Sequence, residues 1–218
     1  MPLPSATSSS PAAAVATWPQ LWRQPAFRYR LLGILAGLLA LGAVIPRFFA
    51  FIQARPGVVL PDPVLAALPA HDVSWLTFGV IYLSIAGAVV HLVPRPALLL
   101  RALWGYGLLH GFRLLTLWLL PLEPPTGLVL LHDPLVDNLF YASATPITKD
   151  LFFSAHTATV LVLGLTVQNR ALRVALLLAA ALIGLLVMVQ HAHYTYDVLA
   201  APLFAGLSVW LARRVARY

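Results

Sequence analysis

The stretch ALRVALLLAAALIGLLVMVQ, residues 171–190, decides the fold of this chain. It is twenty residues long, and its only charged side chain is Arg173. An α-helix needs about 20 mostly apolar residues to cross the hydrocarbon core of a bilayer. Because backbone polar groups in lipid must pair within their own segment, this stretch predicts a transmembrane helix.

Five further stretches of similar character lie on both sides of it, so we predict an all-α bundle of six transmembrane helices. The predicted spans are Leu31–Ile52, Ser74–Val93, Pro96–Leu120, Leu151–Val167, Ala171–Gln190 and Asp197–Ala212. The fourth and sixth are short for a span, which favours tilted helices or helices partly buried in protein.

The composition agrees with a membrane protein and excludes other classes. Hydrophobic residues make up 61% of the 218 residues and charged residues 10%, with a mean hydropathy of +0.86. Soluble domains carry about 25% charged residues, so an ordinary soluble domain is excluded. The net charge of +7 comes from arginines between apolar runs, which indicates membrane topology and no nucleic-acid partner. Cysteine is absent, which excludes disulfides and thiolate metal sites.

The chain divides into three predicted parts. Residues 1–19 are rich in Pro, Ser, Ala and Thr and predict a disordered tail. Residues 20–30 interleave Trp22 and Phe27 with Arg23 and Arg28, a pattern typical of an interfacial segment. Residues 31–218 form the predicted six-span catalytic domain.

Arginine placement predicts that both termini are cytoplasmic. With the N-terminus inside, ten of the thirteen arginines fall at cytoplasmic helix ends, and all seven acidic residues fall on the opposite, exoplasmic side. In a bacterium that side is the periplasmic face of the inner membrane.

Ionisable residues at membrane depth usually mark a functional site, and here three segments bring them to one layer. The third span carries His110 and Arg113 on one face near its outer end. The fourth begins beside Asp150, Ser154 and His156, and the sixth begins beside His193 and Asp197. The chain between His156 and His193 is long enough for one span inward and one span back, so both histidines return to the exoplasmic side.

These residue types suit phosphoryl transfer on a lipid. On a helix, Asp197 would accept the proton of one His193 ring nitrogen and leave the other nitrogen as nucleophile or base. His156 would then protonate the leaving group, and the planar guanidinium of Arg113 matches phosphate oxygens. We predict a reaction through a phosphohistidine.

The motifs resemble those of the sphingomyelin synthase family, a branch of the type 2 phosphatidic acid phosphatase superfamily. Residues 154–157 (Ser-Ala-His-Thr, preceded by Asp150) and 193–198 (His-Tyr-Thr-Tyr-Asp-Val) are similar to its two catalytic motifs. Leu60-Pro61-Asp62 is similar to a signature after the first span. Arg101, Arg113 and Thr116 are similar to the family's third-span motif.

The resemblance implies a phosphotransferase that moves phosphocholine or phosphoethanolamine from a glycerophospholipid to ceramide or a similar lipid alcohol, releasing diacylglycerol. It implies His156, His193 and Asp197 as catalytic residues and no metal or other cofactor. We predict that the substrate contacts Arg113, Asp150, Ser154, Tyr194 and His110. Ala155 replaces the usual glycine and His110 a usual tyrosine, which leaves headgroup and acceptor open, and an oligomer is compatible with the sequence.

Two alternatives stay open from the residues. Water as acceptor would make the protein a lipid phosphate phosphatase or a phospholipase C. The superfamily's phosphatases carry Lys, six residues, then Arg-Pro; Arg95-Pro96 has no such lysine before it, which favours the transferase. The second alternative is a lipid-binding or transport protein with an inactive site. Two structural readings also remain: Arg113 could pair with an acid such as Asp150 or Asp62, and His193 with Asp197 could merely cap a helix.

Overall fold

We use a computed structural model and describe residues 16–133 and 146–217 of it. Within these ranges the regular secondary structure is helical, apart from one isolated bridge between Val58 and Leu122. The helices are α1 (Trp18–Trp22), α2 (Pro25–Ala54), α3 (Pro63–Ala66), α4 (Ser74–Leu92), α5 (Pro96–Leu119), α7 (Ala155–Thr166), α8 (Arg170–Val189) and α9 (Thr195–Val215). The all-α prediction is confirmed. Most of the predicted tail lies outside the described residues.

Five long helices (α2, α4, α5, α8 and α9) and the shorter α7 occupy the positions of the six predicted spans, with shifted ends. Helices α2, α4, α8 and α9 are long and apolar enough to cross a membrane, whereas α7 is apolar but only 12 residues long. The count of six spans and the cytoplasmic placement of the termini stay predictions. The protein is an integral membrane protein by these apolar helices.

The two helices that carry the predicted catalytic motifs do not begin where we predicted, and caps explain both differences. Helix α7 starts at Ala155 rather than Leu151, because the Ser154 side chain accepts the Thr157 N–H and Phe152 has a left-handed φ of 91°. Helix α9 starts at Thr195 rather than Asp197, because the Asp197 carboxylate accepts the Tyr194 N–H in a capping box.

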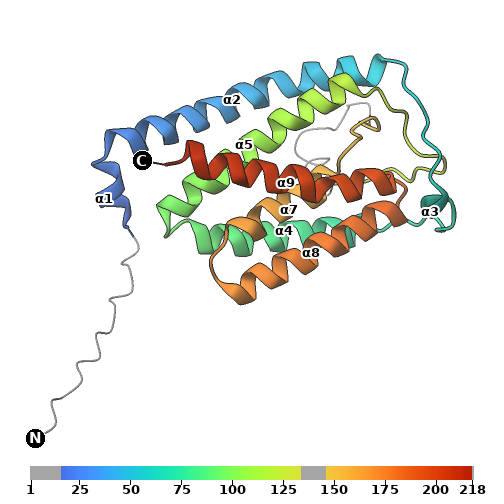
Figure 1. The fold of residues 1–218 in the computed structure, drawn as a ribbon. Helices are drawn as coiled ribbons and strands as arrows, with labels where there is room; N and C mark the ends of the chain where they lie inside the picture. Colours follow the sequence, from blue (N-terminus) through green and yellow to red (C-terminus); the bar gives the residue numbers. More distant parts are fainter. Residues whose placement is uncertain (1–15, 134–145, 218) are drawn as a thin grey trace, which may run out of the picture.

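Helix α7 lies at the centre of the bundle and packs against α4, α5, α8 and α9. Helix α2 runs along α5 at the edge of the bundle (Figure 1), and its apolar surface is almost entirely exposed, as expected of a lipid-facing helix. Helix α1 and the end of α9 lie at one end of the bundle, and α3 lies at the opposite end (Figure 1).

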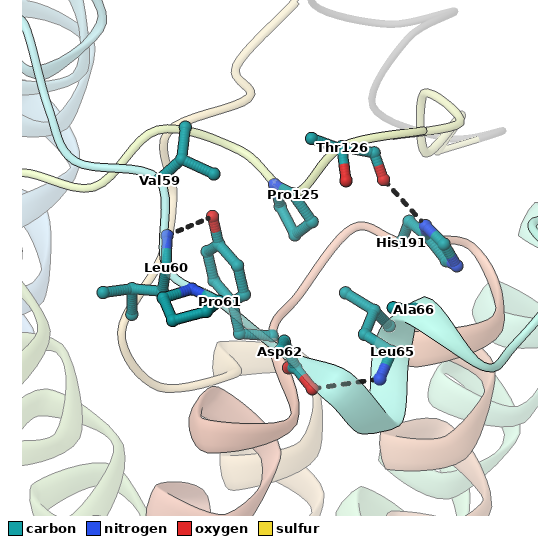
Figure 2. A pocket seen from close by; sticks show the side chains of 10 residues that line it. Val59, Leu60, Pro61, Asp62, Leu65, Ala66, Pro125, Thr126 and His191 are labelled. Atoms are coloured by element: carbon teal, nitrogen blue, oxygen red, sulfur yellow. Dashed lines mark hydrogen bonds between the residues drawn. The ribbon is translucent and has the colours of Figure 1, made fainter.

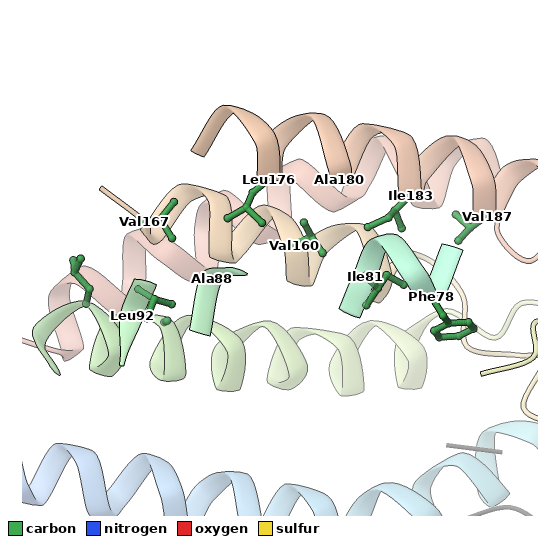
Figure 3. Packing of buried hydrophobic residues seen from close by; sticks show 12 residues of the cluster. Phe78, Ile81, Ala88, Leu92, Val160, Val167, Leu176, Ala180, Ile183 and Val187 are labelled. Carbon is green, nitrogen blue, oxygen red and sulfur yellow. The ribbon is translucent and has the colours of Figure 1, made fainter. Parts of the chain in front are cut away.

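The largest buried cluster joins α4, α7 and α8, as Figure 3 shows, with a contribution from α5. Phe78, Val160, Ile183 and Val187 are among its members. Close packing beside this cluster depends on a glycine: a Cβ atom at Gly184 of α8 would lie 2.7 Å from Val198 Cγ1 of α9.

The loops at the α3 end are held together by the turn between α8 and α9. The buried Gln190 side chain donates to Ser74 Oγ (2.7 Å) and to the Leu130 carbonyl (2.9 Å), and it accepts the Val73 N–H (3.2 Å). His191, whose φ is 53°, has its two ring nitrogens 2.9 and 3.0 Å from the carbonyls of Thr126 and Leu68. This turn therefore holds two segments, the α3–α4 loop and the loop after α5, which we call the outer loops, over the ends of α4 and α8.

The close approach of α8 and α9 generates a testable prediction. We expect Gly184→Ala to destabilise the protein by about 1–3 kcal/mol, since the β-branched Val198 side chain is unable to move away freely. The measurement is the midpoint of thermal unfolding in detergent.

Gly206→Ala in α9 is the matched control, because nothing lies within 4 Å of its added Cβ. Alanine is the better helix former by about 1 kcal/mol, so the Gly206→Ala midpoint should stay equal or rise. Equal midpoints for the two variants would contradict the packing argument.

Candidate active site

The centre of the candidate site is the carboxylate of Asp197 in the first turn of α9. Its Oδ2 atom lies 3.0 Å from His193 Nδ1 and accepts the Tyr194 N–H at 3.1 Å, while Oδ1 accepts the Phe152 N–H at 3.2 Å. Asp197 is fully buried and His193 is 3% exposed. An ionised carboxylate only accepts hydrogen bonds, so Nδ1 of His193 is the nitrogen that donates to Asp197, and Nε2 is the ring nitrogen outside this contact.

The predicted contact between His193 and Asp197 is present, but the local structure differs from the one we expected. We expected both residues on one helix, whereas His193 precedes α9 by two residues. The contact forms because Asp197, as the third residue of the helix, folds back to cap the helix start. The helix-capping alternative is therefore also realised, by the same carboxylate.

The second histidine, His156, lies in the first turn of α7 and faces the first. The two imidazole centroids are 6.0 Å apart in an edge-to-face arrangement. Phe78 of α4 contacts the His156 ring from another side, with centroids 5.7 Å apart. The Nδ1 atom of His156 is buried and has no hydrogen-bond partner among the described residues. One imidazole is thus oriented by a carboxylate, and the other has a ring nitrogen available.

Arg113 of α5 holds the chain segment that leads into α7. Its guanidinium forms an ion pair with the Asp150 carboxylate and donates to the carbonyls of Phe153 and Asp150, the latter at 3.0 Å. Arg113 is 4% exposed. The pairing with Asp150 that the sequence left open is therefore present. A guanidinium has five N–H donors, so these contacts do not exhaust it.

Asp150 carries a negative charge close to both histidines. Burial raises the pKa of Asp150, but the charge and hydrogen bond of Arg113 lower it by more than burial raises it. The pKa of Asp150 therefore lies below its ordinary value. Asp150 also interacts electrostatically with His193 and His156. The structure thus brings together five of the predicted site residues: Arg113, Asp150, His156, His193 and Asp197.

The other three predicted site residues make contacts within the protein. Ser154 Oγ, fully buried, accepts from the Thr157 N–H (3.3 Å) and hydroxyl (3.1 Å) at the α7 cap. The Tyr194 hydroxyl accepts the Leu60 N–H (3.2 Å) and donates to the Glu123 carbonyl (2.9 Å). His110 Nδ1 lies 3.1 Å from the Tyr106 carbonyl one turn earlier in α5. Their roles in substrate binding stay predictions.

A cavity of about 390 Å³ lies beside this centre, between the α2–α3 loop and the α8–α9 turn (Figure 2). Tyr194 is the one predicted site residue that lines it. Its lining residues are Val59, Leu60, Pro61, Asp62, Leu65, Ala66, Pro125, Thr126, His191 and Tyr194. Through Tyr194, which follows His193 in the chain, the cavity adjoins the segment that carries this histidine.

Two residues of the site escaped the sequence reasoning. Phe78 contacts His156 from a helix whose apolar sequence carries no signal for this role. Asp62 had a signal, the Leu60-Pro61-Asp62 motif, but the sequence offered it only as a possible partner of Arg113, whereas it accepts from Thr195 and Arg113 pairs with Asp150. Within the two described ranges, no group of three His, Asp or Glu side chains is arranged to hold a metal ion.

Comparison with known proteins bears on the part of the chain that holds the histidines. Residues 149–214 match the family model described as PAP2 superfamily C-terminal. This region contains Asp150, Ser154, His156, His193, Tyr194 and Asp197. No match was found among curated proteins or among solved structures.

The ion pair between Arg113 and Asp150 gives a second prediction. Arg113→Met should destabilise the protein strongly, because it leaves the Asp150 charge without its partner. Breaking a buried pair costs about 3–5 kcal/mol, and we expect the lower end since the Asp150 side chain is 26% exposed. Thermal unfolding in detergent measures the effect.

The double variant Arg113→Met/Asp150→Leu should regain part of that loss, because no unpaired charge remains. Arg101→Met on the same helix is the control, since the described residues offer Arg101 no ion pair. A double variant no more stable than Arg113→Met would contradict the assigned pairing.

Proposed function

We propose that this protein, whose C-terminal part matches the PAP2 superfamily, is a lipid phosphotransferase. The match supports the type 2 phosphatidic acid phosphatase superfamily, whose members are phosphatases and phosphotransferases. In our proposal the enzyme takes phosphocholine or phosphoethanolamine from a glycerophospholipid and passes it to ceramide or a similar lipid alcohol. The observation that carries the proposal is the pair of facing imidazoles, one held by a buried carboxylate.

In the first half-reaction His193 is the nucleophile. With Nδ1 bonded to Asp197, the Nε2 lone pair attacks the phosphorus of the donor lipid, and Asp197 stabilises the positive charge that develops on the ring. The bond between phosphorus and the diacylglycerol oxygen breaks. His156, in its protonated form, gives its proton to that oxygen, so diacylglycerol leaves as a neutral alcohol. The headgroup phosphate stays on His193.

The second half-reaction reverses these roles. His156, now neutral, takes the proton of the primary hydroxyl of the acceptor lipid, and the oxygen attacks the phosphohistidine. The nitrogen–phosphorus bond breaks and His193 returns to its starting state. A separation of 6.0 Å between the imidazole centroids suits this exchange, because the phosphoryl group is held between the two rings.

Arg113 contributes positive charge beside the reacting group in this proposal. Its contacts with Asp150 and Phe153 fix the guanidinium and hold the entry of α7, which carries His156. A charge fixed before the reaction stabilises the developing phosphoryl charge without reorganisation. Asp150 offsets part of that charge, so the pair sets the local potential together.

The second candidate keeps the same residues and uses water as acceptor. The superfamily match favours it as much as the transferase, because the superfamily includes phosphatases. On a phosphate monoester lipid this reaction releases inorganic phosphate, and on a glycerophospholipid it is a phospholipase C reaction.

We place the site on the exoplasmic side, because the histidines lie at the α3 end of the bundle, where the acidic residues gather and few arginines lie.

Product analysis separates these candidates. We expect purified protein given phosphatidylcholine or phosphatidylethanolamine, labelled in the headgroup, to form a labelled sphingolipid only when ceramide is present. Labelled free phosphocholine or phosphoethanolamine, independent of ceramide, would instead identify a phospholipase C. Inorganic phosphate from phosphatidic acid, without headgroup exchange, would identify the phosphatase, and binding without turnover a lipid-binding protein.

The roles of the two histidines predict different behaviour of their variants. With natural lipids, His156→Gln and His193→Gln should each lose at least about 100-fold in turnover with folding intact, because general acid–base groups contribute that much or more. A nitrophenyl phosphocholine donor, labelled in the phosphocholine group, has a leaving group that needs no proton. With this donor His156→Gln should accumulate labelled phosphocholine on the protein. The label should be acid-labile, as a phosphohistidine is, and absent from His193→Gln.

His71→Gln is the matched control, since His71 lies exposed in the loop before α4. It should retain full turnover. Label retained on His193→Gln would reject the nucleophile assigned here.

A further inference from the structure

The Leu60-Pro61-Asp62 segment binds the three residues that separate His193 from Asp197. Each of its three members pairs with one of residues 194–196. The Leu60 N–H donates to the Tyr194 hydroxyl (3.2 Å), the Tyr196 hydroxyl donates to the Pro61 carbonyl (3.1 Å), and Asp62 accepts from Thr195. The loop after α2 is thus attached along the start of α9.

Asp62 makes the strongest of these contacts. Its Oδ2 accepts the Thr195 N–H at 2.7 Å, and its Oδ1 accepts the Thr195 hydroxyl at 3.0 Å and the Leu65 N–H at 2.9 Å. Figure 2 shows Asp62 where the loop enters α3, beside the cavity. Burial raises the pKa of Asp62, but the hydrogen bonds from Leu65 and Thr195 together lower it by more than burial raises it. The pKa of Asp62 therefore lies below its ordinary value. Hydrogen bonds to an ionised carboxylate are short and strong.

The contact is placed where it affects the candidate catalytic pair. Thr195 is the first residue of α9, two residues after His193 and two before Asp197. A shift of this turn would move Asp197 Oδ2 relative to His193 Nδ1, which it now meets at 3.0 Å. The Asp197 carboxylate is itself part of the cap, so the geometry of the helix start and of the catalytic pair is the same geometry.

We infer that Asp62 is a positioning residue for the reaction: it fixes the first turn of α9 through Thr195, so that Asp197 holds His193 in the reactive orientation. Asp62 itself touches no reacting atom in this inference. The inference rests on the proposed function for the reaction that is positioned, and on the hydrogen bonds alone for the positioning.

Asp62→Asn tests it with little change in volume. The amide has one acceptor oxygen for two backbone N–H groups. With that oxygen on the Leu65 N–H, the contact of a helix N-cap, the NH₂ group faces the Thr195 N–H, two donors in contact. We expect kcat to fall about 10- to 100-fold, the cost of a small displacement of catalytic groups, with KM unchanged. In protein labelled with ¹⁵N-histidine, the downfield signal of the His193 Nδ1 proton, assigned with His193→Gln, should broaden or shift.

Three variants control the test. Thr195→Val loses only the hydroxyl contact and should show a smaller effect, whereas Thr195→Ser keeps both contacts and should behave as the wild type. Asp72→Asn is the matched control, because Asp72 accepts from Ser74 at the start of α4 and more weakly from Gln190 (3.3 Å), but has no hydrogen bond with α9. It should leave both kcat and the His193 signal unchanged, even if it lowers the thermal midpoint.

The outcomes separate this inference from the proposed function, since the His193 signal needs no lipid. A changed signal in Asp62→Asn, with Asp72→Asn unchanged, supports the positioning even if the wild type turns over none of the lipids. A wild-type His193 signal in a folded Asp62→Asn or Thr195→Val protein, or loss of the signal equally in Asp72→Asn, would overturn it.

Discussion

One buried carboxylate organises this molecule. Asp197 is fully buried, and an ionised carboxylate without partners is costly in such an environment. It is stabilised by three donors from two parts of the chain, which are the His193 ring, the Tyr194 N–H and the Phe152 N–H. The backbone of Asp197 accepts in addition the Ser154 N–H. The requirement to satisfy one charge therefore joins the start of α9 to the segment before α7, and so brings one histidine to the other.

The ion pair of Arg113 with Asp150 holds the segment before α7 from a second side. Arg113 reaches from α5 to the same segment before α7, where it meets Asp150 and the Phe153 carbonyl. Phe152, with its positive φ, lies between Asp150 and Phe153 in the chain and donates its N–H to Asp197. The segment is thus held from α5 on one side and from α9 on the other. This explains why α7 is a short helix. Residues 151–154, which we predicted as its first turn, instead form a non-helical segment whose backbone contacts Asp197 and Arg113.

The loops at this end of the bundle form a second layer that supports the first. The α2–α3 loop attaches to α9 through Asp62 and Thr195, and the α8–α9 turn attaches to both outer loops through Gln190 and His191. Polar side chains that a membrane would penalise are therefore paired with backbone groups of the loops. A phosphoryl-transfer site needs this rigidity, because its two histidines must keep their separation while bond-making moves from one ring to the other.

The hydrophobic pattern alone predicts the all-α class and the approximate positions of the long helices, because about 20 apolar residues in a row have few other stable structures. The sequence also predicted that His193 and Asp197 meet, since the two residues are four positions apart in the chain. It did not determine where α7 and α9 begin, because capping competes with helix extension at Ser154 and Asp197 and tertiary contacts decide between them. Three contacts of the site join residues far apart in the chain. They are Phe78 with His156, Arg113 with Asp150, and Asp62 with Thr195. Only the packing of α4, α5 and α9 around α7 places those side chains together, because no local pattern encodes the distance between separate helices.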